Sequence, residues 1–169
     1  MNRVTKISSA PPPKESAKTE IVAPATKRIL VVDDDPSVRE MLTRVLAGEG
    51  YQATAAASGD EALKIVTATP FDLVLLDLNM PGKNGWDTFE RLTTENPLVA
   101  VIIITARPNQ LFTAVGAGVG ALLEKPLDFP KLLETMTRLL AEPDESRLAR
   151  IAGKPAEFHY LPPNNHRQP

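Results

Sequence analysis

The sequence predicts an α/β fold built on a doubly wound, five-stranded parallel sheet. Short, continuous runs of valine, isoleucine and leucine are typical of parallel strands whose two faces are both covered by helices. Four such runs lie at residues 29–32, 73–76, 101–104 and 121–123. Between them the apolar spacing changes from strand-like to helical, and strands that alternate with helices indicate right-handed crossover connections.

The helices expected between these strands have apolar stripes and recognisable ends. The first follows Asp35 as its cap, has Pro36 in its first turn and ends near Gly50. The second begins at Ser58 with the spacing of a capping box, and Pro70 ends it. The other expected elements are a weaker strand at 51–55 and three helices, marked by Trp86 and Phe89, by Leu111 and Phe112, and by Leu132, Leu133 and Met136.

Composition excludes several classes of protein. The chain has 169 residues, 43% of them hydrophobic, and no apolar run near the length of a membrane span, so we expect no membrane insertion. The first residues lack the continuous apolar core of a secretory signal, although their basic, acid-poor character is shared with transit peptides. We therefore expect a cytoplasmic protein. With no cysteine there is no disulfide, thiolate zinc site or cysteine nucleophile.

Prolines divide the chain into three parts. Nine of the sixteen prolines lie in residues 1–27 or 143–169, so we expect a disordered N-terminal arm, a folded domain over 28–142 and a Pro-rich C-terminal tail. The tail should hold a short helix near 145–151 and then an extended segment. Residues 1–26 and 153–169 contain too little apolar material to offset the entropy of ordering them, so trimming both segments should change stability little.

The folded domain is acidic. The arm carries a net charge of +3 and the tail +1, which leaves −6 for residues 28–142 out of a total of −2. Nucleic-acid binding depends on clustered lysine and arginine that neutralise phosphates, so we expect no nucleic-acid partner.

Carboxylates follow two of the predicted strands directly. Asp33 and Asp34 end the apolar run at 29–32 and Asp77 ends the run at 73–76, while Thr105 and Lys125 follow the two later runs. The carboxyl ends of parallel strands meet at one edge of the sheet, where ligands bind. Three carboxylates, a hydroxyl and an ammonium should therefore converge on a site suited to a divalent cation and a phosphoryl group.

Simpler explanations exist for single residues but not for the whole set. Aspartates at strand ends are often caps, and Asp35 before Pro36 is read as one. A lone threonine or lysine is more often structural or solvated. An aspartate accepts a phosphoryl group only if cations and donors neutralise the transferring oxygens, and Mg²⁺ prefers carboxylate and carbonyl ligands, so the convergence of all of them favours a chemical site.

Four motifs follow one another within residues 28–142, namely Ile29–Asp35, Asp77–Gly82, Thr105-Ala106 and Lys125-Pro126. In order and spacing they resemble the receiver domain of two-component response regulators, and the likeness covers residues 28–142. The resemblance implies a flavodoxin-like (βα)5 fold with Asp77 as the phosphoacceptor. It also implies Mg²⁺ held by Asp34 directly, by Asp33 through water, by Asp77 and by the backbone carbonyl of Asn79. Lys125 would pair with the acyl phosphate, and Thr105 would donate its hydroxyl to a phosphate oxygen.

The resemblance further implies a stand-alone signalling switch and not a turnover enzyme. A sensor histidine kinase or a histidine phosphotransfer protein would supply the phosphoryl group from a phosphohistidine. Output to a downstream protein target would pass through the face formed by the fourth helix, fifth strand and fifth helix. One residue departs from the pattern, because Leu122 stands where such receivers commonly carry tyrosine or phenylalanine.

Two alternatives come from other classes. The first is an interaction module that binds partners regardless of phosphorylation, and Leu122 keeps it open. The second is an aspartate-nucleophile phosphatase, in which a second aspartate lies two residues after the nucleophile, whereas this chain has Asn79. The glycines of 116–120 precede a strand and are read as a helix end and turn rather than a dinucleotide loop. His159 and His166 lie in the tail and are not expected to carry phosphate or metal.

Overall fold

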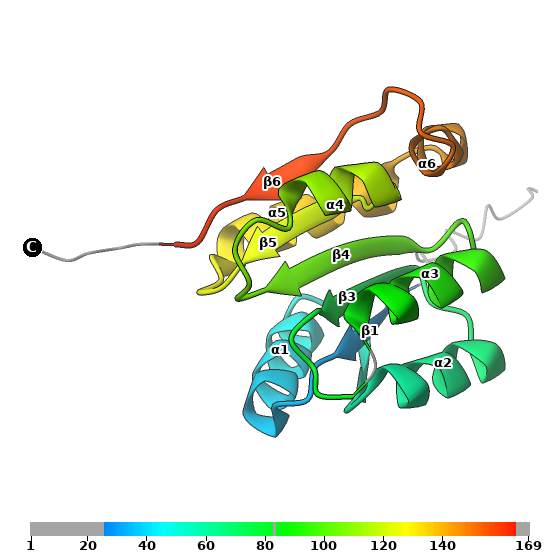
Figure 1. Ribbon diagram of the computed structural model, residues 1–169. Coiled ribbons are helices and arrows are strands. Elements are labelled where there is room, and N and C mark those ends of the chain that lie inside the picture. Colours follow the sequence, from blue (N-terminus) through cyan, green and yellow to red (C-terminus); the bar gives the residue numbers. More distant parts are fainter. Residues whose placement is uncertain (1–25, 83, 165–169) are drawn as a thin grey trace, which may run out of the picture.

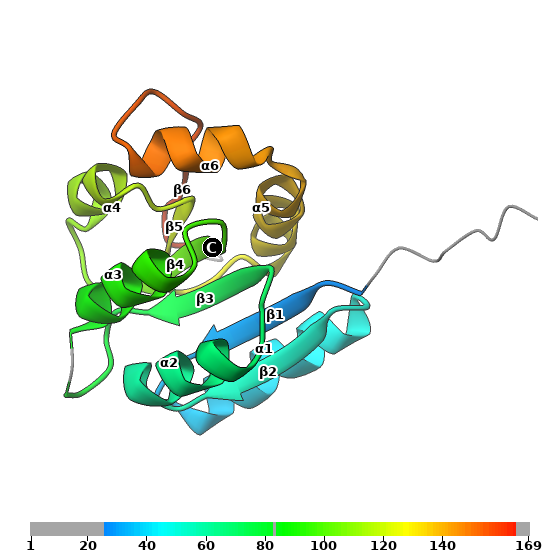
Figure 2. The same ribbon diagram turned by 90° about the vertical axis from the view of Figure 1, so that its right-hand side faces the viewer.

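Six parallel strands form one sheet with helices on both faces (Figure 1; Figure 2). The computed structural model describes residues 26–82 and 84–164. Within them the spatial order of the strands is β2-β1-β3-β4-β5-β6. The strands are β1 (Arg28–Val32), β2 (Gln52–Ala56), β3 (Leu73–Asp77), β4 (Ala100–Thr105), β5 (Ala121–Glu124) and β6 (His159–Leu161). The helices are α1 (Pro36–Gly48), α2 (Gly59–Ala68), α3 (Gly85–Glu95), α4 (Leu111–Ala117), α5 (Phe129–Ala141) and α6 (Asp144–Ile151).

The α/β class and the parallel sheet are confirmed, but the number of strands differs from the prediction. The sixth strand, β6, lies in the segment that we expected to be a flexible Pro-rich tail, and it pairs in parallel with β5. The short helix expected near 145–151 is present as α6. A strand of three residues beside two prolines has almost no periodicity, so only the free edge of β5 explains why it forms. The N-terminal arm lies outside the described residues except for its last two.

The sheet separates two apolar layers because alternate residues of each strand point to opposite faces. One layer joins Leu30, Val74 and Ile103 to apolar side chains of α2, α3 and α4. The other joins Ile29 and Ile102 to side chains of α1 and α5. Strands β3 and β4 are buried along their whole length. Each fully buried leucine or isoleucine contributes about 1.5–3 kcal/mol, so these strands form a rigid base for the loops at their carboxyl ends.

The helix starts follow the sequence signals. The carboxylate of Asp35 accepts hydrogen bonds from the backbone N–H groups of Ser37 and Val38, and Pro36 occupies the first turn of α1. The hydroxyl of Ser58 accepts from the N–H of Glu61 at 3.2 Å. Each cap satisfies backbone donors that the helix itself leaves free. These caps set where the chain turns after β1 and β2.

Candidate functional site

Three aspartates meet where β1 and β3 end. The carboxylate oxygens of Asp33, Asp34 and Asp77 lie within 4.8 Å of one another. Asp33 and Asp77 are each 3% exposed, whereas Asp34 is open to solvent. Oxygen ligands on opposite sides of an octahedral Mg²⁺ are about 4 Å apart, so this spacing fits a small, hard cation. The buried pair supplies fixed ligand atoms, and the exposed aspartate leaves an entry route.

Lys125 joins two of the aspartates. Its Nζ lies 3.1 Å from Asp33 Oδ2 and 3.1 Å from Asp77 Oδ2. Its backbone N–H donates to the carbonyl of Thr105 at 2.8 Å, which fixes the lysine beside the end of β4. One ammonium therefore faces two buried carboxylates. The residues that follow β1, β3 and β5 come together, as predicted, and direct ion pairs join them.

Burial and pairing act in opposite directions on these charges. Burial raises the pKa of the Asp77 carboxyl, and the Asn79 N–H and the Lys125 ammonium oppose this rise without cancelling it. Burial by itself lowers the pKa of Lys125, but attraction to Asp77 and Asp33 outweighs it, and the pKa of Lys125 is raised. Both pKa values are raised, but the rise disfavours the charged form of Asp77 and favours the charged form of Lys125, because Asp77 is the more deeply buried partner. A divalent cation beside Asp77 would favour its charged form.

Thr105 and Asn79 form the side of the site next to β4. The Thr105 hydroxyl donates to Asn79 Oδ1 at 3.0 Å and accepts from the N–H of Arg107 at 2.9 Å. The N–H of Asn79 donates to Asp77 Oδ1 at 2.8 Å. Thr105 is completely buried, so its hydroxyl is held at the site rather than solvated. Its donor faces Asn79 in this structure, and a phosphoryl oxygen would compete for it.

The structure adds contacts that the sequence did not predict. The indole N–H of Trp86, which in the sequence served only to mark an expected helix, donates to Gln110 Oε1 at 3.1 Å and so connects α3 to the loop between β4 and α4. The ring also packs edge-on against Phe89. A half-buried tryptophan usually has a hydrogen-bond acceptor for its N–H, so the sequence indicated that Trp86 would have one. It did not indicate which residue, because the acceptor lies 24 residues away. Arg39 Nη1 donates to the backbone carbonyl of Asp33 at 2.7 Å.

Leu122 is completely buried in the layer that also contains Ala114 of α4. It is paired with Tyr160 of β6. Paired residues of neighbouring parallel strands point to the same face, so the Tyr160 side chain lies on the α4 side of the sheet, next to Leu122. An aromatic residue is thus present beside this position, but on a neighbouring strand.

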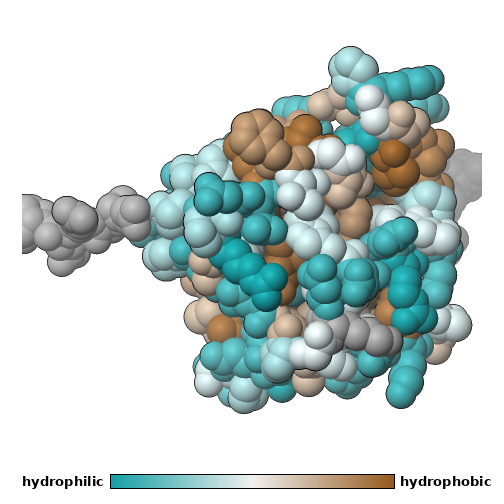
Figure 3. All heavy atoms as spheres, viewed as in Figure 1, coloured by the Kyte–Doolittle hydropathy of each residue, from teal (hydrophilic) through white to brown (hydrophobic). Residues whose placement is uncertain are grey.

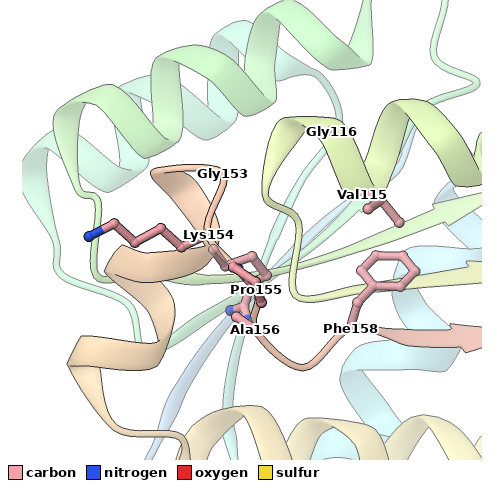
Figure 4. Close-up of a pocket in the computed structure, with 8 residues that line it drawn as sticks. Val115, Gly116, Gly153, Lys154, Pro155, Ala156 and Phe158 are labelled. Carbon is pink, nitrogen blue, oxygen red and sulfur yellow. The ribbon is translucent and has the colours of Figure 1, made fainter.

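A separate cleft of about 380 Å³ lies between α4 and the segment that connects α6 to β6, and it contains none of the predicted site residues. Figure 4 shows the Phe158 ring directed toward Val115 of α4. As expected, the 116–120 region ends a helix, with Gly118 in the left-handed conformation at φ 76°. Figure 3 shows hydrophobic surface gathered over the part of this view where α4, β6 and α6 lie. Its exposed members include Phe112 and Val115.

A family model for the response regulator receiver domain matches residues 29–137. The chain belongs to the response regulator receiver family. It is 41% identical over 134 residues to the DNA-binding response regulator MtrA of Mycolicibacterium smegmatis, a match over 78% of this chain and 55% of that protein. It is also 41% identical over 133 residues to the transcriptional regulatory protein ZraR of Salmonella typhimurium, a match over 77% of this chain and 30% of that protein. The chain therefore spans about half or less of these relatives.

Solved receiver structures share the fold. The response regulator TrrA of Thermotoga maritima, solved in complex with Mg²⁺-BeF, has a TM-score of 0.63 and 34% identity, covering 68% of this chain and 99% of that one. A CheY-like receiver domain protein of Methanospirillum hungatei has a TM-score of 0.67 and 31% identity, covering 72% and 98%. Among residues 26–82 and 84–164, no helix has both the length and the apolar content needed to span a membrane.

Proposed function

We propose that this receiver takes a phosphoryl group from a phosphohistidine onto Asp77. The observation that carries the proposal is the position of the Asp77 carboxylate, buried between the other two aspartates and the ammonium of Lys125. In the reaction the P–N bond of the phosphohistidine breaks, a bond forms between phosphorus and a carboxylate oxygen of Asp77, and the histidine nitrogen keeps the electron pair and takes a proton. The product is an acyl phosphate.

Lys125 and Thr105 would receive the transferred group. The lysine ammonium already lies 3.1 Å from an Asp77 oxygen, so it can neutralise charge on the phosphoryl oxygens without a large movement. The Thr105 hydroxyl can exchange its acceptor from Asn79 Oδ1 to a phosphoryl oxygen. Both groups are fixed at the ends of buried strands, which is the preorganisation that phosphoryl transfer requires.

The donor set suits Mg²⁺ as the cofactor. Asp34 would ligate it directly and Asp33 through water, with an Asp77 oxygen and the backbone carbonyl of Asn79 as the other protein ligands. All are hard oxygen donors, which this cation prefers. Bound Mg²⁺ would supply the positive charge that lets an anionic phosphoryl group approach three carboxylates. The Mg²⁺-BeF complex of the related regulator TrrA supports this assignment.

We further propose the protein's partners and cellular place. The phosphoryl donor is a sensor histidine kinase or a histidine phosphotransfer protein in the cytoplasm, and output passes to a downstream protein target by direct contact, without DNA binding by this domain. The exposed apolar residues of α4 support α4 as part of the output surface. Because β6 covers the outer edge of β5, this surface would include β6. The chain would act as a switch and not as a turnover enzyme.

The proposal is tested by labelling with a small-molecule phosphodonor in the presence of Mg²⁺. Asp77→Asn should abolish incorporation of hydroxylamine-labile phosphate, because it removes the carboxylate oxygen that would bond to phosphorus in the acyl phosphate. Asp87→Asn, an exposed position in the first turn of α3, is the matched control and should label normally. Undiminished labelling of Asp77→Asn would show that another residue accepts the phosphoryl group.

A second function is favoured by one observation, the complete burial of Leu122 among apolar side chains. A leucine there can neither carry a hydroxyl nor rotate a ring between buried and exposed positions, so the domain could bind its partner in the same way with and without phosphate. Partner binding measured before and after phosphorylation separates the two functions. Equal affinity in both states would favour the interaction module.

A further inference from the structure

Strand β6 lies beyond the part of the chain that matches the receiver family model, which ends at residue 137. After α6 the chain runs back along the outer edge of β5 (Figure 1). The N–H of His159 donates to the carbonyl of Gly120 at 3.2 Å, and the N–H of Asn164 donates to the carbonyl of Pro126 at 3.1 Å. These two bonds lie just before and just after β5, so the returning segment spans the full length of that strand.

A buried arginine holds the return in place. Arg150 of α6 is 8% exposed and forms an ion pair with Glu142, with Nη2 2.8 Å from Oε2. The same guanidinium donates to the carbonyls of Gly118 and Glu157. A side chain at Gly118 would place its Cβ 2.9 Å from the Arg150 carbonyl oxygen, so α6 can approach this closely only because residue 118 is glycine. Several contacts of the buried Arg150 and the close approach at Gly118 therefore hold the returning segment in position.

The contacts of β6 and of the residues directly after it fall on both neighbours of Lys125. The Tyr160 hydroxyl lies 3.1 Å from Glu124 Oε1, directly before the lysine. The backbone N–H of Asn164 donates to the carbonyl of Pro126, the residue directly after the lysine. On the other side of the strand, the Lys125 N–H binds Thr105 of β4. The backbone that presents the lysine ammonium to Asp77 is thus held from the β4 side and from the β6 side.

We propose that β6, together with residues 162–164 that follow it, is a positioning element for the phosphorylation site, with Tyr160 and Asn164 as the positioning residues. They limit the movement of residues 124–126 and so keep the Lys125 ammonium within reach of the phosphoryl oxygens. This proposal rests on the proposed function of Asp77. Because coupling between two equilibria is reciprocal, phosphorylation at Asp77 tightens the docking of β6 on β5 by the same factor by which docked β6 favours the phosphorylated state.

The test compares the two tyrosines of the chain. Tyr160 is exposed, and Tyr160→Phe removes only the hydroxyl that contacts Glu124. Tyr51→Phe is the matched control, because Tyr51 lies next to β2, at the opposite edge of the sheet. The affinity for beryllofluoride in the presence of Mg²⁺ is measured by calorimetry. We expect Tyr160→Phe to lower it about three- to tenfold, the effect of losing one hydrogen bond, and Tyr51→Phe to leave it unchanged. Affinity for Mg²⁺ alone should be equal in all three proteins.

A double-mutant cycle distinguishes positioning from a general loss of stability. Glu124→Ala should weaken beryllofluoride binding as much as Tyr160→Phe does, and combining them should add nothing further. In the unmodified protein, beryllofluoride with Mg²⁺ should slow amide exchange at His159 and Asn164. The amide of Gln52, which donates to Lys27 at the far edge, should not respond.

Two negative results have different meanings. If the unmodified protein binds beryllofluoride but Tyr160→Phe matches Tyr51→Phe within twofold and the β6 amides exchange at an unchanged rate, β6 does not position the site. If the unmodified protein binds no beryllofluoride and Asp77→Asn labels like the unmodified protein, the proposed function is wrong, and the role of β6 in it is overturned as well.

Discussion

Single side chains divide the acidic site into a buried part and an exposed part. Asp33 and Asp77 share the ammonium of Lys125, whereas the exposed Asp34 lies in the same cluster. In the absence of a cation, three carboxylates face one ammonium, and the excess negative charge opposes folding. A bound divalent cation would therefore stabilise the charge of Asp34 most, because Lys125 pairs with Asp33 and Asp77.

Replacing Asp34 should separate metal binding from folding. Asp34→Ala is expected to weaken Mg²⁺ binding at least tenfold, because it removes the carboxylate that we propose coordinates the ion directly, while stability in metal-free buffer stays equal or rises slightly. Titration calorimetry and thermal unfolding measure the two effects. Asp35→Ala is the control, since it removes a helix cap worth about 1 kcal/mol but should leave Mg²⁺ affinity unchanged. Equal Mg²⁺ affinity in Asp34→Ala and the unmodified protein would remove Asp34 from the ligand set.

A second residue, Asp72, links the start of β1 to β3 and has a pH-dependent role. Burial raises the pKa of its carboxyl, but the Arg28 N–H and the Lys27 ammonium outweigh this, and the pKa is lowered below 3.8. Its stabilisation is therefore present above pH 3.8 and is lost as the pH falls through the lowered value.

Asp72→Asn should reduce the free energy of unfolding by about 1 kcal/mol near neutral pH, since the side chain is 32% exposed and solvent screens part of its interaction. Denaturant unfolding at neutral pH and at acid pH measures the difference, which should shrink as the pH falls through the lowered pKa. A difference that persists undiminished in acid would mean that the carboxylate charge is not responsible.

At the scale of elements, α6 and β6 change the status of the C-terminal tail. Leu161 of β6 packs against the layer that contains α1 and α5, and Arg150 joins α6 to the turn after α4. The expectation that trimming residues 153–169 has little effect on stability is therefore inconsistent with the packing of β6. The sequence of the tail is rich in proline and polar residues, and its few apolar side chains became informative only when paired with β5.

Removing residues 154–169 should lower the free energy of unfolding by about 2–4 kcal/mol, the contribution of the partly buried Phe158 and Leu161 together with the hydrogen bonds of a short strand. Removing residues 1–25 is the matched truncation and should have little effect, because that segment contains few apolar residues. Both truncations are compared with the full chain by denaturant unfolding. An unchanged stability after the C-terminal truncation would show that β6 docks only weakly.

At the scale of the whole molecule, the buried layers on the two faces of the sheet determine which positions can change. Leu122 has no exposed surface and lies in the layer shared by α2, α3 and α4. A larger side chain there must displace its neighbours, so introducing the aromatic residue that many receivers carry is not a neutral change in this chain.

Leu122→Tyr is expected to lower the free energy of unfolding by about 1–3 kcal/mol, because the added volume and hydroxyl enter a packed layer, while phosphate uptake at Asp77 continues. Leu122→Met conserves volume and is the control, with a loss below about 1.5 kcal/mol. Unfolding and phosphodonor labelling measure both variants. If phosphate uptake by Leu122→Tyr fell far more than by Leu122→Met, Leu122 would take part in the phosphorylation site.

The sequence by itself determined the parallel sheet, the helix starts and the residues of the acidic site. Apolar runs, caps and strand-end aspartates act over a few neighbouring residues, so their meaning can be read locally. Only the tertiary structure decided that Lys125 lies between Asp33 and Asp77, that Trp86 binds Gln110 and that the tail adds β6. These contacts join residues far apart in the chain, and they form because a buried charge, an indole N–H and an open sheet edge each need a partner that folding alone brings close.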